Sequence, residues 1–311
     1  MEALLETIFM TLALVLFILF FFPTKLKRYF GIAAWVALLA GLFMMLPELL
    51  AEGNFVYPVL LIFSLVLLYI AIKRLLKDDP AMKDFTVMGG VFCILYVPFL
   101  LFKPLADWLI GTVVAGIRMV FDAIGFEYYM IDPAHPLSEH FFNYFFSVDP
   151  VATGIEFIYN GQTEWVQQAV GYSDMIVLGC TGITAIALLV AVVAVTNTGW
   201  IRKILLGILV TAVIFIINIF RNVFVLGAYF GQWFPWCEDW LVSMTGTYIP
   251  GYASFFWSHN VICECGAFLI IILLALLLFK LAPDLLSRVK AIVMMFVTDL
   301  RDLVRGRRHK T

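Results

Sequence analysis

Charge is scarce in this sequence. Only 14% of its 311 residues are Asp, Glu, Lys or Arg, well below the roughly one quarter found in soluble domains. Hydrophobic residues account for 63% of the chain, and the mean hydropathy is +1.01. This composition excludes an ordinary soluble globular protein. The formal net charge of -2 says little about partners, because the location of charges matters more than their sum in a membrane protein, and nothing in the sequence indicates nucleic-acid binding. We therefore expect most of the chain to lie in a lipid bilayer.

Paired cysteines and familiar cofactor motifs are also lacking. The sequence has five cysteines, an odd number scattered through apolar segments, which is not typical of a disulfide framework. These residues are Cys93, Cys180, Cys237, Cys263 and Cys265. No His-Glu-x-x-His zinc motif, phosphate-binding loop or dinucleotide fingerprint occurs. We expect at least one free thiol and neither a metal nor an organic cofactor.

The first residues lack the basic region that opens a secretory signal peptide. Glu2 and Glu6 occupy this place, and no small-residue cleavage site follows the first apolar run. We expect that run to be a retained membrane helix.

Long apolar runs, in contrast, recur along almost the whole chain. A run of about 18 residues can cross a hydrocarbon core of about 30 Å. Seven such runs are Leu4–Phe22, Gly31–Leu46, Tyr57–Lys73, Val87–Phe102, Met175–Val195, Ile204–Ala228 and Phe255–Lys280. An eighth, Leu105–Phe126, is interrupted by Asp107, Arg118 and Asp122, so it either spans the membrane or lies in the interface. The expected fold class is an all-α polytopic membrane protein with seven or eight transmembrane helices.

The distribution of Lys and Arg predicts the orientation, because cytoplasmic loops are enriched in these residues. Basic residues follow the first and third runs, precede the sixth, and are frequent after Pro283. The segment 126–174 contains several Asp and Glu residues but no Lys or Arg. We expect this segment and the N-terminus outside, and the C-terminus inside. That arrangement requires Leu105–Phe126 to remain at the outer face.

Four parts of the chain follow from these patterns. They are N-terminal transmembrane helices with an interfacial helix (1–125), a small extracytoplasmic cap (126–174), late transmembrane helices carrying the candidate site (175–282) and a basic cytoplasmic tail (283–311).

Three late runs each contain one residue suited to chemistry. Cys180 is predicted near the outer end of a helix that begins at Ser173 or Asp174, where the helix dipole favours a thiolate. Arg221 lies about 18 residues beyond Lys203, so a helix would carry it roughly 27 Å towards the outer surface. His259 opens the last run at the same level, and its ordinary pKa suits proton transfer.

Each of these residues also has a structural explanation. A membrane cysteine is most often a packing residue, an arginine near a helix end can extend to the interface, and an interfacial histidine is common. The functional hypothesis depends on three helices bringing a thiol, a guanidinium and an imidazole to one depth.

The motifs Cys180-Thr-Gly182 and Asn218-x-x-Arg221, followed by His259, resemble the archaeosortase/exosortase family. The resemblance covers roughly Met175–Leu278. His259 stands where archaeosortases typically carry Arg and exosortases carry His.

The resemblance implies a thiol protease and transpeptidase that removes a C-terminal sorting segment from secreted proteins. Such a segment contains a short motif, a hydrophobic helix and a basic tail. Cys180 would form an acyl-thioester, which an amine on a membrane lipid would release. Arg221 would donate a proton to the leaving group or hold the thiolate, and His259 would stabilise the transition state or transfer a proton.

Other interpretations remain open. His259 and Cys263 are four residues apart and could form their own dyad on one helix face. Cys237 could pair with Cys263 or Cys265. A transporter or channel is an alternative function, in which Arg221, Glu264 and His259 would line a permeation path. Intramembrane hydrolysis without transfer to an acceptor is another.

Overall fold

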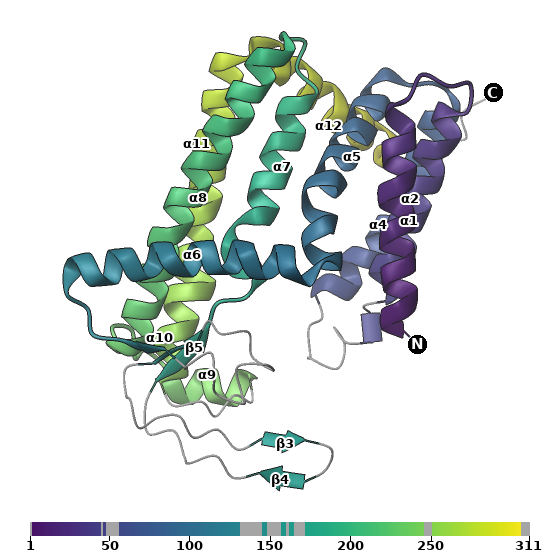
Figure 1. Cartoon of the computed structure of the whole chain (residues 1–311). Coiled ribbons are helices and arrows are strands. Elements are labelled where there is room, and N and C mark those ends of the chain that lie inside the picture. The colour runs from purple at the N-terminus through teal and green to yellow at the C-terminus, as the bar shows by residue number, and fades with distance from the viewer. Residues whose placement is uncertain are drawn as a thin grey trace. The chain divides into compact units, whose positions relative to one another are not determined.

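The structure is a computed structural model that describes residues 2–44, 46–47, 56–130, 145–147, 157–159, 162–164, 172–245 and 251–305. Within these ranges, seven helical segments are long and apolar enough to cross a membrane. They are α1 (Glu2–Phe21), α2 (Lys27–Met44), α4 (Val56–Leu76), α5 (Pro80–Leu101), α6 (Lys103–Ile124), α8 (Trp200–Phe230) and the continuous segment Tyr252–Leu281 (Figure 1). The predicted class, an all-α polytopic membrane protein, is confirmed.

The remaining described elements are short or lie beyond the last span. The helices α7 (Ile183–Ala194) and α9 (Glu238–Thr245) are too short to be counted as spans, and α12 (Pro283–Val304) follows the last one. Strands β1 (Tyr129–Met130), β2 (Phe145–Ser147) and β5 (Ser173–Met175) form an antiparallel sheet in the order β1-β2-β5. Strands β3 (Phe157–Tyr159) and β4 (Gln162–Glu164) form a separate pair. Most of the predicted cap (126–174) lies outside the described residues, so its role stays a prediction.

The chain divides into two compact units. Unit 1 comprises Met1–Lys103, Thr184–Thr211 and Ala275–Thr311, and unit 2 comprises Pro104–Ile183 and Ala212–Leu274.

An aromatic contact organises the first helices of unit 1. The ring of Trp35 stacks on Phe85 with centroids 5.1 Å apart and meets Phe17 edge-on at 5.3 Å. Its indole N–H donates to the hydroxyl of Thr86 at 3.2 Å. Gly89 provides the necessary space, because a Cβ there would lie 2.6 Å from the Trp35 ring. These contacts bind α2 to α1 and α5.

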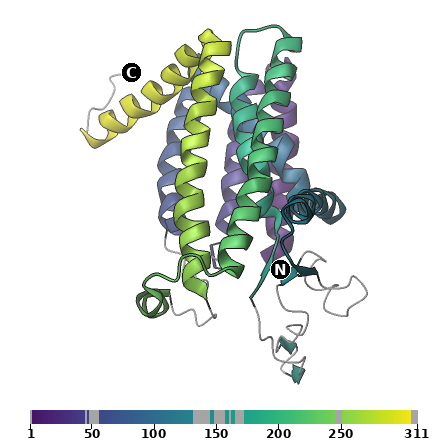
Figure 2. The same cartoon turned by 90° about the vertical axis from the view of Figure 1, so that its left-hand side faces the viewer.

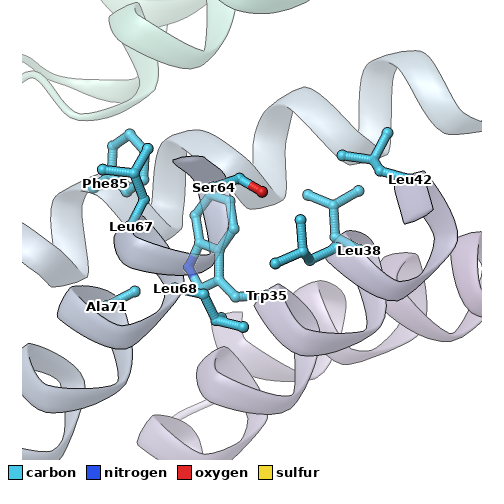
Figure 3. Close-up of a pocket in the computed structure, with 9 residues that line it drawn as sticks. Trp35, Leu38, Leu42, Ser64, Leu67, Leu68, Ala71 and Phe85 are labelled. Atoms are coloured by element: carbon cyan, nitrogen blue, oxygen red, sulfur yellow. The ribbon is translucent and has the colours of Figure 1, made fainter. Parts of the chain in front are cut away.

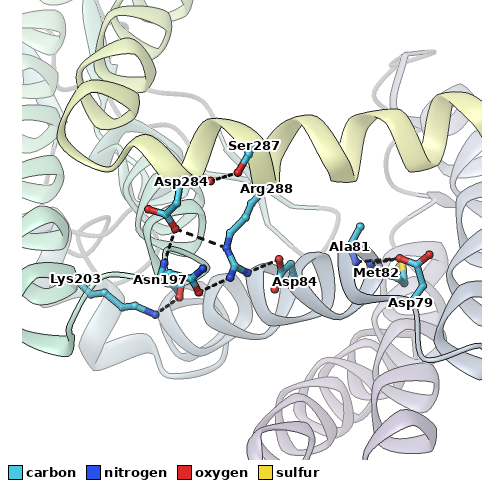
Figure 4. Close-up of polar contacts among 10 residues, drawn as sticks. Asp79, Ala81, Met82, Asp84, Asn197, Lys203, Asp284, Ser287 and Arg288 are labelled. Atoms are coloured by element: carbon cyan, nitrogen blue, oxygen red, sulfur yellow. Dashed lines mark hydrogen bonds and ion pairs between the residues drawn. The ribbon is translucent and has the colours of Figure 1, made fainter.

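Ion pairs connect α12 to residues near the ends of other helices in unit 1. Arg288 on α12 binds Asp84 of α5 at 2.6 Å and also contacts the side chain of Asn197 (Figure 4). Asp299, only 2% exposed, accepts two hydrogen bonds from Arg74 at 2.6 and 3.0 Å. Two charged side chains of α12 thus bind partners near the connection between α4 and α5.

In unit 2, α6 packs across the C-terminal half of α8. One face of α6 is buried with α8 residues in a hydrophobic cluster, which includes Val113, Ile117 and Leu226. Gly116 allows the close approach, since a Cβ there would lie 2.5 Å from Ile219 of α8. The two helices cross instead of running side by side (Figures 1 and 2). This crossing supports the interfacial placement of residues 105–126, which stays a prediction.

The predicted helix start before Cys180 is wrong. Ser173–Met175 is a strand paired with β2, the next helical element is the short turn η2 (Leu178–Thr181), and α7 begins only at Ile183. Hydrogen bonding of residues 173–175 to β2 prevents them from adopting helical geometry. The run Met175–Val195 therefore contains 12 α-helical residues in α7, fewer than a simple membrane span requires.

Candidate active site

Cys180 lies in the compact turn η2, directly before α7. The hydroxyl of Thr181 donates to the carbonyl of Leu178 at 2.7 Å, which closes the turn. Gly182 then adopts a left-handed conformation with φ +76°, which favours glycine. The side chain of Cys180 packs against the hydrophobic cluster between α6 and α8. The thiol thus sits on an ordered turn at the start of a helix.

Two asparagines of α8 hold the backbone of this turn. The side-chain amides of Asn218 and Asn222 both donate to the carbonyl oxygen of Cys180, at 2.7 and 2.8 Å. Both side chains are buried, with exposed fractions of 8% and 3%. Gly182 is also required here, because a Cβ would lie 3.1 Å from the Asn218 side chain. The nucleophile candidate is therefore anchored to α8 through its own peptide group.

The same stretch of α8 presents Arg221. The guanidinium contacts His259 Nε2 at 3.2 Å and makes a long contact with Asn222 Oδ1 at 3.5 Å. Glu264 Oε1 lies 3.8 Å away. Arg221 is 18% exposed at its side chain and Glu264 is 64% exposed, so the guanidinium lies inward while the carboxylate remains open. Arg221 therefore connects the α8 asparagines to the last helix.

The partners of His259 determine its tautomer. A guanidinium can only donate hydrogen bonds, so the ring nitrogen Nε2 that contacts Arg221 acts as the acceptor. The proton then resides on Nδ1, which lies 2.7 Å from Asn260 Oδ1 and donates to it. His259 is thus a neutral imidazole whose accepting nitrogen is engaged by Arg221.

His259 lies in a π-helical segment, η3 (Trp257–Cys263), between α10 (Tyr252–Phe256) and α11 (Glu264–Leu281). Such segments are rare and often occur at functional sites, because the wider turn redirects side chains. The His259 ring stacks on Phe255 with centroids 5.0 Å apart, and Phe255 in turn meets Tyr229 of α8 at 5.7 Å. Aromatic packing thereby holds the imidazole towards α8.

The electrostatic environment keeps the thiol protonated at rest. Burial raises the pKa of Cys180, the charge of Asp174 raises it further, and Arg221 and the backbone of Val177 act in the opposite direction. Burial also raises the pKa of Asp174 to about 6, although its carboxylate accepts a hydrogen bond from the Met175 N–H. Cys180 therefore does not have the lowered thiol pKa that was expected from a helix N-terminus, because desolvation has the larger effect and raises the pKa.

The structure brings the three predicted residues together to different degrees. Arg221 and His259 are in direct contact, and Cys180 is joined to the Arg221 helix through Asn218 and Asn222. Among the described residues, no hydrogen bond links the Cys180 thiol to Arg221 or His259. The catalytic roles of Cys180, Arg221 and His259 stay predictions.

The competing cysteine has different surroundings. Cys263 is 8% exposed, and within the described part of the chain it makes no hydrogen bond with His259. The π-helical turn between them alters the simple i, i+4 alignment on which the dyad depended. All five cysteines are free thiols, so Cys237 pairs with neither Cys263 nor Cys265.

Sequence reasoning missed Asn222, Asn260 and Asp174. A signal for Asn222 exists in the chain, because two asparagines four residues apart on an apolar helix share one face, and buried amides require partners. Asn260 and Asp174 give no comparable local signal.

A cavity of about 140 Å³ in unit 1 offers no reactive groups. Trp35, Leu38, Leu42, Ser64 and Leu68 are among its lining residues (Figure 3). The hydroxyl of Ser64 donates to the carbonyl of Leu61, and the indole N–H of Trp35 donates to Thr86. Its polar groups are therefore satisfied internally, and the cavity suits only hydrocarbon.

Fold and site together define a class: a multi-pass helical membrane protein with a partly buried cysteine turn, which an asparagine connects to a guanidinium–imidazole pair. The chain is 31% identical over 127 residues to archaeosortase A of Natronomonas pharaonis, covering 40% of each chain. It is 25% identical over 139 residues to archaeosortase A of Haloferax volcanii, covering 45% of this chain and 46% of the relative. These matches support membership of the archaeosortase family, as the motifs predicted.

The matched regions span less than half the length of these curated relatives. No family model matches the chain. No solved structure matches it either.

Proposed function

We propose that this protein is a cysteine transpeptidase, which cleaves a C-terminal sorting segment from secreted proteins and transfers the new C-terminus to a membrane lipid. One observation carries the proposal: a continuous set of contacts runs from the Cys180 carbonyl through Asn222 and Arg221 to His259. The similarity to archaeosortase A supports the same class of reaction.

In the first step, the Cys180 sulfur attacks the scissile carbonyl carbon. A carbon–sulfur bond forms, the carbon–nitrogen bond breaks, and the thiol proton passes to the departing amine to give an acyl-thioester. A guanidinium retains its proton at neutral pH, so Arg221 acts through its charge and its donors, on the thiolate or on the developing oxyanion.

His259 has two tasks in this scheme. It holds the Arg221 guanidinium in the resting site through Nε2. When Arg221 turns to the oxyanion, Nε2 is released and accepts the thiol proton, which it then gives to the leaving amine. The neutral tautomer, set by Asn260, leaves this nitrogen able to accept.

In the second step, an amine of a lipid headgroup attacks the thioester. A carbon–nitrogen bond forms, the carbon–sulfur bond breaks, and the sulfur regains a proton from the amine. Neighbouring membrane lipid supplies the acceptor, and partial burial of Cys180 limits the access of water, which favours transfer over hydrolysis. The site faces the outside in the proposed orientation, with the C-terminus in the cytoplasm.

The first test follows a co-expressed secreted protein that ends in a motif, a hydrophobic helix and a basic tail. Its size and lipid labelling are measured with wild type, Cys180→Ala, Arg221→Ala, His259→Ala and Cys263→Ala. Cys180→Ala should abolish processing, Arg221→Ala should slow it by about 10² to 10³-fold, and His259→Ala by about 10²-fold or more.

Cys263→Ala is the matched control, because it removes another thiol of unit 2, which is buried, and should retain processing. Normal processing by Cys180→Ala would overturn the proposed nucleophile. A shortened product without lipid would instead indicate hydrolysis without transfer.

A further inference from the structure

The two α8 asparagines do more than satisfy a buried carbonyl. Asn218 and Asn222 lie one helical turn apart, and both donate to the same oxygen of Cys180. Asn222 Nδ2 also donates to the Asn218 carbonyl at 3.0 Å. One oxygen thus receives two side-chain donors from consecutive turns of one helix, which fixes both the height and the rotation of the Cys180 peptide relative to α8.

Asn222 occupies a central place in this arrangement. Its amide nitrogen faces two carbonyl oxygens, those of Cys180 and Asn218, while its amide oxygen faces Arg221. Only this orientation of the amide satisfies all three neighbours. The side chain therefore bridges the turn that bears the thiol and the guanidinium that would act on it.

The local sequence is adapted to this contact. Gly182 packs against Asn218, and any larger residue would both strain the left-handed backbone and press on the amide. Thr181 is fully buried and closes the turn from the other side. The turn is thus held by contacts that involve neither the thiol nor a substrate.

We infer that Asn218 and Asn222 are positioning residues that hold the Cys180 turn in register with Arg221. They touch no substrate in this scheme and act through the backbone of the nucleophile. The effect on turnover rests on the proposed function, whereas the effect on the thiol does not. A misplacement of about 1 Å at a reacting group can cost about 10²-fold in rate.

The test measures the pH dependence of Cys180 alkylation by iodoacetamide, with peptide mass spectrometry to assign the modified thiol. Loosening the turn changes both the solvation of the thiol and its distance from Arg221, so one variant alone is ambiguous. A double-mutant cycle with Arg221 separates the effect of this distance on the alkylation midpoint from the effect of solvation. Arg221→Gln should raise the alkylation midpoint in the wild-type background, because the charge of Arg221 lowers the pKa of the thiol.

In the Asn222→Ala background, Arg221→Gln should move this midpoint far less, because Asn222 no longer connects the Cys180 turn to Arg221. Asn222→Ala is the variant for the cycle, because Asn222→Asp would add a carboxylate that faces Arg221 and itself changes the pKa of the thiol. Asn222→Ala should lower kcat for processing about 10²-fold with KM nearly unchanged.

Thr86→Val is the matched control, because it also deletes buried side-chain hydrogen bonds but lies in unit 1. It should leave the alkylation midpoint unchanged. Should Asn222→Ala fail to fold, Asn218→Ala, which retains the Asn222 donor, decides the question by the same cycle.

An Arg221→Gln shift of equal size in all backgrounds would overturn the inference, even if processing is lost. Suppose that Arg221→Gln no longer shifts the alkylation midpoint in the asparagine variants, and that the wild type processes no tailed substrate. The positioning role would then stand, and the proposed function would be rejected.

Discussion

At the scale of single residues, the carboxyl group of Asp174 couples the site to pH. Burial raises its pKa from 3.8 to about 6, so the folded protein binds this proton more tightly than the unfolded chain. Its contribution to stability is complete below about pH 4 and is lost as the pH rises through about 6. The difference corresponds to at most roughly 3 kcal/mol.

We predict that wild-type protein loses thermal stability between pH 4 and pH 7 and that Asp174→Asn reduces this loss. The variant should also alkylate faster at Cys180, because the charge that raises the thiol pKa is gone. Thermal unfolding in detergent and iodoacetamide kinetics measure the two effects. Asp239→Asn, an exposed position on α9, should behave like wild type. Equal pH dependence in wild type and Asp174→Asn would contradict the prediction.

At the scale of elements, α12 is attached by a few charged contacts. Asp299 is almost completely buried and binds Arg74 through two hydrogen bonds, with Lys73 a further 3.6 Å contact. Removing one member of a buried pair leaves a charge without its partner. Arg74 retains Asp79 at 2.9 Å and is a quarter exposed, which moderates the loss.

Asp299→Ala should therefore lower the free energy of unfolding by about 1 to 3 kcal/mol. Denaturation of the purified protein in detergent measures this change, and limited proteolysis of α12 should accelerate in parallel. The control is Asp78→Ala, which breaks an exposed ion pair with Lys83 and should change stability little. An equal effect of the two substitutions would show that burial of Asp299 contributes nothing.

At the scale of the whole molecule, the charge pattern predicts which ends face the cytoplasm. Cys237 is exposed between α8 and α9, on the side predicted to be outside. A membrane-impermeant maleimide should label Cys237 in intact cells. A cysteine introduced by Lys77→Cys, in the loop between α4 and α5, should react only after permeabilisation in a Cys237→Ser background. The reverse pattern would invert the proposed topology and place the site inside.

Membrane segments were predictable because hydropathy is a local property. The expected runs overlap α1, α2, α4, α5, α8 and the segment Tyr252–Leu281. Their ends differ by several residues, since capping decides them: Asp79 accepts from the backbone of Ala81 and Met82, so α5 begins before the predicted Val87.

Candidate residues were also visible in the sequence, because an arginine or histidine in an apolar run is costly and therefore conspicuous. The hydrogen bonds that connect these residues could not be predicted from the sequence. The three hydrogen bonds that join Cys180 to Asn218 and Asn222, and Arg221 to His259, link residues 38 or 42 positions apart. No periodicity along one helix predicts which side chain of another will meet it.

The sequence by itself determined the membrane class, most of the spans, and the identities of Cys180, Arg221 and His259 as candidates, because composition, charge and motif order act along the chain. Only the tertiary structure decided that the cysteine lies in a turn before α7, that asparagines hold its carbonyl, and that the imidazole contacts the guanidinium. Strand pairing and buried hydrogen bonds between distant residues override local helix preference there, since an unpaired polar group in an apolar interior is more costly than a lost helical turn.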